Sequence, residues 1–181
     1  MMIRFLVFLI LICMSNNHAS AQDKIHHIIT PVSYFVDHVK QLKLIKDNLN
    51  KYRQASIVGI TGIGKSQLAR AYAFENRDKY NLIWIIDCNL NVDAEFVKIA
   101  KELNKVKHLN LSEDLKSARK KVKEYLSNQE GWLLVFDNLK INENNKVKDI
   151  IDWEHNGHIV FCSQDTDKLP NVIRMSELST N

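Results

Sequence analysis

Four unbroken apolar runs recur along the chain, and segments of helical periodicity separate most of them. The runs are ASIVGI at 55–60, NLIWIIDC at 81–88, GWLLVFDN at 131–138 and HIVFCSQ at 158–164, with a weaker fifth, NVIRMSEL, at 171–178. Continuous apolar runs alternating with helices are typical of parallel strands covered on both faces. The pattern therefore predicts an α/β fold of three layers, with a parallel sheet of about five strands flanked by helices.

Helices between these runs are indicated by apolar residues that recur every three or four positions. The first helical segment, at 39–52, places Val39, Leu42, Ile45, Leu49 and Tyr52 on one face. A second lies at 67–76, and two further segments carry Phe96, Ile99, Ala100 and Leu103, and then Leu115, Ala118, Val122, Tyr125 and Leu126. We expect these apolar faces to cover the sheet.

The first 21 residues have the layout of an export signal. Arg4 precedes the apolar stretch 5–14, and Ala19-Ser20-Ala21 offers a cleavage site after Ala21. As a helix the stretch reaches ~15 Å of a ~30 Å hydrocarbon layer, which favours a signal peptide over a membrane span. A buried N-terminal helix or strand is the alternative.

We expect a signal peptide at 1–21, a linker at 22–30 and one domain at 31–181. The protein is then exported or membrane-tethered if the leader acts as a signal, and cytoplasmic otherwise.

Composition narrows the function classes. The formal net charge is +4, and lysines are scattered over polar helix faces, which favours a solvated surface over a nucleic-acid footprint. One of the three cysteines lies in the leader, so no disulfide framework is expected, and Cys88 and Cys162 are interpreted as core thiols. No cluster of His, Cys and acidic residues has the spacing of a metal site built by protein ligands alone.

Three of the five glycines fall in the single stretch GITGIG at 59–64, which Lys65 and Ser66 follow directly. The spacing fits the phosphate-loop pattern G-x-x-x-x-G-K-[ST], and it lies between an apolar run and a helix, as that loop requires. Glycines let the main-chain amides approach an anion, backed by the positive end of the next helix. Lys65 supplies a point charge to the β- and γ-phosphates, and the Ser66 hydroxyl is a ligand for Mg²⁺. A tight turn with an incidental lysine is the alternative interpretation.

The second half of such a site should be an acid at the end of another buried strand. The run WLLVFDN provides it in Asp137. A carboxylate there would reach Mg²⁺ directly or through water. The alternative is a turn aspartate after a strand. Lys65 and Asp137 are therefore the candidate catalytic residues, and Ser66 and Asp137 the candidate metal ligands.

With both motifs in order, the chain resembles the NB-ARC branch of the STAND class of P-loop NTPases, from about Pro31 to Leu178. The segments VGITGIGKSQLA and WLLVFDNL resemble its two phosphate-site motifs, and PVSYFVDHVKQLKLIKDNL stands where the family has an aromatic-Val-Gly-Arg segment. GHIVFCSQD stands where the family has its sensor strand, and VIRMSEL resembles the strand entering the next subdomain. The resemblance implies a sheet in the order 5-1-4-3-2, bound ADP or ATP with Mg²⁺, and slow turnover that switches the protein between states.

The resemblance also implies roles for individual residues. Phe35 and Val36 would lie near the adenine. The phosphates would be held by Gly62, Ile63, Gly64, Lys65, Ser66 and Gln67, and Gln164, on a strand between the two phosphate motifs, would face the γ-phosphate. Three motifs depart from the family: Asp37-His38 replaces Gly-Arg, Asn138 replaces the acid that orients water, and Gln164 replaces the sensor arginine.

These departures predict nucleotide binding with weak or absent hydrolysis. The chain also stops about where the family's helical and winged-helix subdomains should begin, so only the nucleotide-binding part is expected. There are two alternatives. One is an active P-loop ATPase or kinase. The other is a non-catalytic interaction remnant that associates with partners through its exposed sheet or oligomerises.

Overall fold

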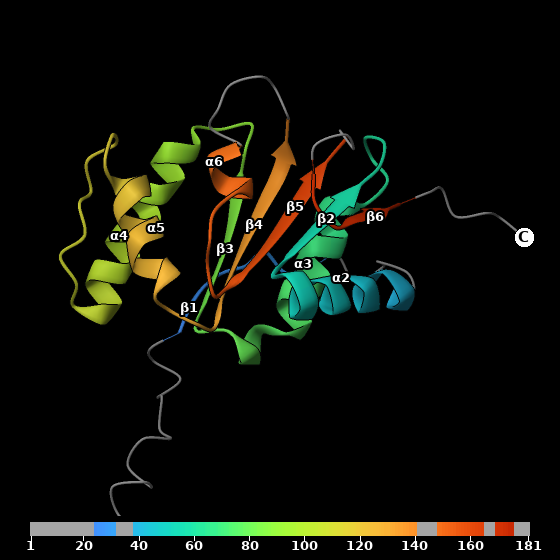
Figure 1. The fold of residues 1–181 in the computed structure, drawn as a ribbon, viewed down its shortest axis with the longest axis horizontal. Coiled ribbons are helices and arrows are strands. Elements are labelled where there is room, and N and C mark those ends of the chain that lie inside the picture. Colours follow the sequence, from blue (N-terminus) through green and yellow to red (C-terminus); the bar gives the residue numbers. More distant parts are fainter. Residues whose placement is uncertain (1–23, 32–37, 141–147, 165–168, 176–181) are drawn as a thin grey trace, which may run out of the picture.

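The computed structural model describes residues 24–31, 38–140, 148–164 and 169–175. It contains one sheet of six strands in the order β1-β3-β4-β5-β2-β6, with every neighbouring pair parallel (Figure 1). The strands are β1 (Ile25–His27), β2 (Gln54–Val58), β3 (Leu82–Asp87), β4 (Trp132–Leu139), β5 (His158–Ser163) and β6 (Val172–Arg174). The predicted α/β class and parallel sheet are confirmed, with six strands instead of about five.

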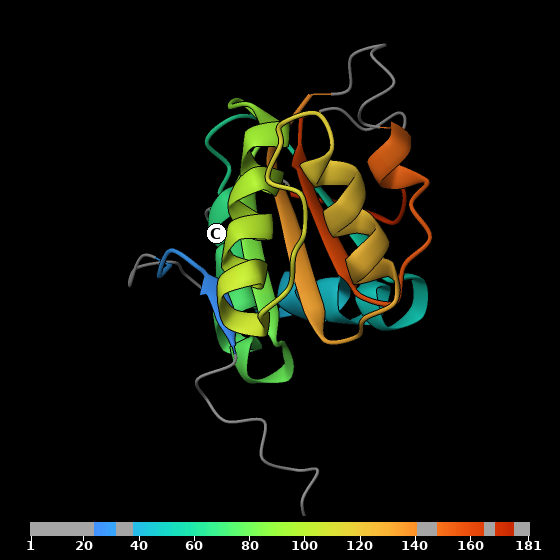
Figure 2. The same ribbon diagram turned by 90° about the vertical axis from the view of Figure 1, so that its left-hand side faces the viewer.

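Helices cover both faces of the sheet, so the fold has the three expected layers (Figures 1 and 2). The helices are α2 (Val39–Tyr52), α3 (Lys65–Glu75), α4 (Val92–Lys107), α5 (Ala118–Ser127) and α6 (Lys148–Ile151), and a short 3-10 helix, η2, spans Arg77–Lys79. Helices α2 and α3 pack on one face through Ile45, Leu49, Leu68, Ala69 and Tyr72. Helices α4, α5 and α6 pack on the other through Phe96, Ile99, Leu103, Val122, Leu126 and Ile150.

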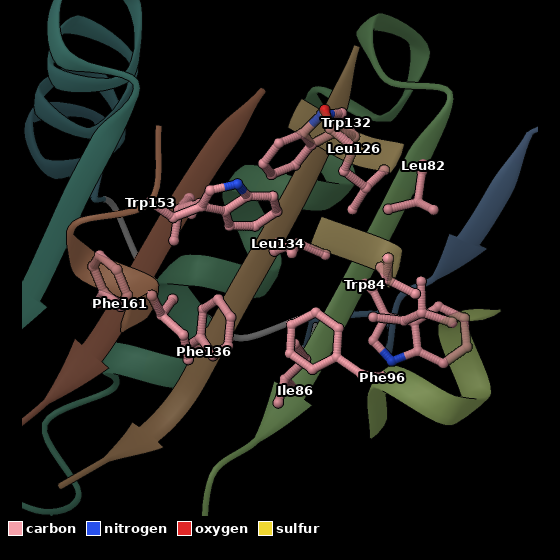
Figure 3. Close-up of a cluster of buried hydrophobic side chains, with 14 of the residues drawn as sticks. Leu82, Trp84, Ile86, Phe96, Leu126, Trp132, Leu134, Phe136, Trp153 and Phe161 are labelled. Carbon is pink, nitrogen blue, oxygen red and sulfur yellow. The ribbon is translucent and has the colours of Figure 1, made fainter. Parts of the chain in front are cut away.

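Successive residues of the central strands enter the two cores in alternation, because side chains of a strand point to opposite faces. In β4, Trp132, Leu134 and Phe136 belong to the core under α4 and α5 (Figure 3). The intervening Leu133 and Val135 belong to the core under α2 and α3. A strand buried on both faces needs apolar residues at every position, which is why β4 reads as an unbroken run.

The strand order agrees with the one that the family resemblance implies. Numbered without β1, the strands lie as 2-3-4-1-5, which is 5-1-4-3-2 from the opposite edge. The additional strand β1 lies within 22–30, which the sequence predicts as a linker, and pairs with Leu82–Trp84 of β3. Its Ile25 is buried and its His27 ring stacks on Trp84 at 4.5 Å between centroids.

The predicted helices lie at the expected positions, but some residues of their predicted apolar faces are exposed. Of the predicted apolar face at 39–52, Ile45 and Leu49 are fully buried, whereas Val39 is 71% exposed and Tyr52 48% exposed. Leu115 precedes α5 and is 47% exposed. Cys162 is buried and Cys88 partly buried, both as free thiols. Within the described part of the chain, no helix is long and apolar enough to cross a membrane.

Two histidines at the amino-terminal end of the sheet should make stability depend on pH. Burial is the main cause that lowers the pKa of His155 to about 4. The positive charges of Arg53 and Lys123 add to this shift, and a hydrogen bond to the Gly157 carbonyl partly opposes it. Burial, reinforced by Arg53 and His155, lowers the pKa of His158 to about 4. The unfolded chain binds these protons first, near the ordinary pKa of about 6.5, so folding stability falls as pH drops from about 6.5 to about 4.

After allowing for solvent screening, we expect the two residues to remove about 2 kcal/mol of the free energy of unfolding over that pH range. Urea unfolding of the wild type and of H155N/H158Q at pH 7, 6 and 5 measures this, and the double variant should show a flatter dependence. H108N is a matched control, because His108 is exposed and in the left-handed conformation that Asn also adopts. Parallel pH dependences in wild type and double variant would contradict the assignment of the stability loss to His155 and His158.

Candidate functional site

The loop between β2 and α3 has the conformation that only its glycines adopt at low cost. Gly62 has φ +81° and Gly64 has φ +101°, in the left-handed region that L-residues rarely occupy. A Cβ on Gly62 would meet no atom within 4 Å, so the backbone there faces open space. Gly59 serves a different purpose, because a Cβ there would lie 2.9 Å from the Met175 carbonyl oxygen beyond β6.

Lys65 begins α3, and its ammonium folds back over the loop. Its Nζ donates to the carbonyl oxygen of Gly59 at 2.9 Å and to that of Ile60 at 2.8 Å. These two bonds hold the positive charge close to the main-chain amides of the loop. An anion above the loop would therefore meet the charge of Lys65 together with the amino end of α3.

The predicted partner of Ser66 lies at the end of β4. The Ser66 hydroxyl donates to Asp137 Oδ1 at 2.7 Å, although the two residues are 71 positions apart in the sequence. The same carboxylate oxygen accepts the Asn138 main-chain N–H at 3.0 Å. Asp137 is 5% exposed and Asn138 has φ +58°, next to a register irregularity between β4 and β5. The two candidate metal ligands are thus adjacent.

Arg70, which is not among the residues predicted from the sequence, also reaches Asp137. Its Nη2 lies 3.8 Å from Asp137 Oδ2, with side chains 23% and 7% exposed respectively. Arg70 follows Ser66 by four positions in α3, which places both residues on the same side of the helix. That spacing is the signal that could have identified Arg70 beforehand.

Asn138, which stands where the resembled family has the acid that orients water, forms a hydrogen bond to Asp87. Its Nδ2 donates to Asp87 Oδ1 at 3.0 Å, and the same oxygen accepts the Asn89 N–H at 3.0 Å. Asp87 ends β3, so these bonds tie the carboxyl ends of β3 and β4 together. An amide cannot act as a general base.

These elements surround a cavity of about 720 Å³ at the carboxyl ends of the strands. The described residues that line it are Thr61, Gly62, Gly64, Lys65, Ser66, Gln67, Asn89, Asn138, Leu139, Lys140, Cys162, Ser163 and Gln164. The structure therefore brings together Gly62, Gly64, Lys65, Ser66, Gln67 and Gln164 of the predicted set. Ile63 instead packs against the core under α2 and α3. Phe35, Val36 and Asp37 lie outside the described residues.

The strand that carries Gln164 lies where the resemblance places it. β5 pairs with both β2 and β4, and so separates the strand before the loop from the strand that contains Asp137. Gln164 follows β5 directly and is exposed at the cavity lip. Its amide can hydrogen-bond an oxygen there but brings no charge.

The donor set suits Mg²⁺ held jointly with a phosphate. Among the described residues, no group of three His, Cys, Asp or Glu side chains could hold a metal ion. Mg²⁺ in nucleotide sites usually has one or two protein oxygens, completed by phosphate oxygens and water. Ser66 Oγ and Asp137 Oδ1, 2.7 Å apart, are two such oxygens beside the loop.

Comparison with known proteins agrees with this geometry. No protein-family model matches the chain. A nucleotide-binding leucine-rich repeat (NLR)-like protein from the fungus Hyaloscypha variabilis is 29% identical over 143 residues, covering 71% of this chain and 14% of the relative. The chain therefore spans about a seventh of that protein.

Solved structures share the fold. Cdc6p from Pyrobaculum aerophilum matches with a TM-score of 0.57 and 15% identity, over 76% of this chain and 44% of its own. The Walker-type ATPase paby2304 of Pyrococcus abyssi matches with a TM-score of 0.50 and 21% identity, over 76% of this chain and 47% of its own. The sheet order and these likenesses show the three-layer α/β fold of P-loop ATPases, and the two phosphate-site motifs make the chain similar to the NB-ARC branch of the STAND class.

Proposed function

We propose that the domain binds ADP or ATP together with Mg²⁺ and acts as a nucleotide-dependent switch with weak or absent hydrolysis. The observation that carries this proposal is the hydrogen bond of 2.7 Å between Ser66 and Asp137. It joins the two phosphate-site motifs at the rim of a cavity that also contains the left-handed glycines and Lys65. The name of the fungal relative also refers to nucleotide binding.

The phosphates would lie over the loop between Gly62 and Gln67. Main-chain amides at a helix amino end offer several donors to one anion at no cost in reorganisation. Lys65 would exchange its bonds to two carbonyl oxygens for stronger bonds to phosphate oxygens. Gln67, in α3, and Gln164, directly after β5, would add uncharged donors.

The metal would be held between Ser66 and Asp137. When bound, Mg²⁺ neutralises charge on the phosphate oxygens. Ser66 would turn its oxygen lone pair to the ion, and Asp137 would face it directly or through a water molecule. The main-chain N–H of Asn138 keeps the carboxylate oriented in either case.

Isothermal titration of the chain with Mg-ADP and Mg-ATP tests the proposal. We expect saturable binding of one nucleotide per chain with a dissociation constant below about 100 µM, which corresponds to roughly −5.5 kcal/mol. Inorganic phosphate at the same concentrations is the control for non-specific anion binding. A nucleotide response no stronger than that of phosphate would reject the proposal.

Turnover should be slow, because neither Asn138 nor Gln164 supplies what hydrolysis needs. Asn138 cannot accept a proton from water and is bonded to Asp87, and Gln164 carries no charge to offset the γ-phosphate. We expect phosphate release from Mg-ATP well below about one per second, the lower end of the ordinary enzyme range. A phosphate-release assay under saturating ATP measures it, and a rate above that value would favour an active ATPase.

A further inference from the structure

The pairing of Arg70 with Asp137 gives the candidate metal site a counter-ion of its own. Asp137 is almost wholly buried, and its Oδ1 is occupied by the Ser66 hydroxyl and the Asn138 N–H. Its Oδ2 faces Arg70 Nη2 at 3.8 Å. A buried carboxylate without a compensating charge is strongly unfavourable, so Arg70 offsets a charge that would otherwise stand alone in the absence of a metal.

Arg70 reaches Asp137 without lining the cavity. It is not among the described residues that line the cavity, whereas Lys65 and Ser66 of the same helix are. Its Nε is buried and has no hydrogen-bond partner among the described residues. Within the described part of the chain, Asp137 is the carboxylate that forms an ion pair with Arg70. Arg70 is therefore placed to act on Asp137 and not on a phosphate.

We propose that Arg70 is a positioning residue that substitutes for the charge of Mg²⁺ at Asp137, so that the site retains a nucleoside diphosphate when the metal is absent. This inference rests on the proposed function, because it concerns regulation of the same site. Without metal, Arg70 prevents Asp137 from repelling the phosphates. With metal, Arg70 competes for the same carboxylate and repels the ion, which weakens the metal's contribution.

The expected signature is an increase of ADP affinity by Mg²⁺ that is smaller in the wild type than in Arg70→Met. We define the metal dependence as the ratio of the ADP dissociation constants in EDTA and in Mg²⁺. In Arg70→Met this ratio should rise about tenfold or more, because the uncompensated carboxylate weakens ADP binding only when no metal is present. Arg70→Lys keeps the charge and should restore most of the wild-type ratio.

Arg77→Met is the matched control, since Arg77 is exposed just after α3 and its Nη1 donates to the Phe74 carbonyl oxygen, not to a carboxylate. Its metal dependence should equal that of the wild type. An Arg70→Met ratio indistinguishable from the wild type, or no recovery in Arg70→Lys, would overturn the proposal.

A second measurement, without nucleotide, separates failure of this inference from failure of the proposed function. Unfolding of the nucleotide-free wild type, Arg70→Met, Asp137→Asn and the double variant forms a double-mutant cycle. We expect a clear coupling, with Asp137→Asn less harmful once Arg70 is gone. Additive effects would refute the counter-ion. Coupling in a wild type that binds no ADP would refute both the nucleotide function and the metal substitution, leaving only a structural ion pair.

Discussion

Replacing Lys65 with alanine is expected to weaken Mg-ADP and Mg-ATP binding at least about a hundredfold, or roughly 2.7 kcal/mol. Lys65 is the cation that the loop itself presents at the cavity, and its Nζ is already held over the loop by the Gly59 and Ile60 carbonyl oxygens. Charge-assisted hydrogen bonds to phosphate are among the strongest that a side chain makes. The variant loses them while the glycine backbone stays in place.

Titration calorimetry of Lys65→Ala beside Lys79→Ala measures the effect. Lys79 lies in η2 at the opposite end of the sheet, and its Nζ donates to Asn76 Oδ1, so its removal should leave nucleotide affinity unchanged. Circular dichroism should show the same fold in both variants. Equal nucleotide affinities of the wild type and Lys65→Ala would mean that the loop does not bind a phosphate.

Replacing Gly157 with alanine is expected to destabilise the fold by about 3 kcal/mol or more. A Cβ on Gly157 would overlap the Cδ2 and Cε2 atoms of the Trp132 indole. The indole cannot move aside freely, because its Nε1 donates to the Leu126 and Gln129 carbonyl oxygens and its ring stacks on Trp153 at 5.1 Å between centroids (Figure 3). Because the ring is fixed, neighbouring side chains cannot move to relieve the overlap with the new Cβ.

Thermal unfolding measures this as a fall in the melting temperature of roughly 6–12 °C for a domain of this size. Asn156→Ala is the control, since Asn156 is exposed in the adjacent position and its change should have little effect. A Gly157→Ala variant with the melting temperature of the wild type would show that Trp132 is packed less tightly than the structure indicates.

The parts of the fold that the sequence predicts well are those in which burial dictates every residue. β3 and β4 lie inside the sheet, each with a strand on both sides and helices on both faces, so each contains an unbroken apolar run. An aspartate follows each run, Asp87 in β3 and Asp137 in β4. The proximity of Ser66 and Asp137 follows from the motifs, because parallel strands bring their carboxyl ends to one edge.

The parts that the sequence does not reveal depend on contacts between distant segments. β1 has three residues, and only Ile25 is buried, so no periodicity marks it as a strand. The spacing of Arg70 from Ser66 places both residues on one side of α3, but only the position of β4 in the fold brings Asp137 within reach of Arg70. The exposure of Val39 and Tyr52 reflects the ends of α2 extending past the core that holds Ile45 and Leu49.

Binding of a metal ion by Ser66 and Asp137 together with ADP is tested by titrating Mn²⁺, as a paramagnetic substitute for Mg²⁺, into the chain with and without ADP. Electron paramagnetic resonance follows the bound ion. We expect one tightly bound ion per chain only when ADP is present, lost in both Ser66→Ala and Asp137→Asn. Binding of Mn²⁺ with ADP that is unchanged in both variants, or no bound ion at all, would contradict this expectation.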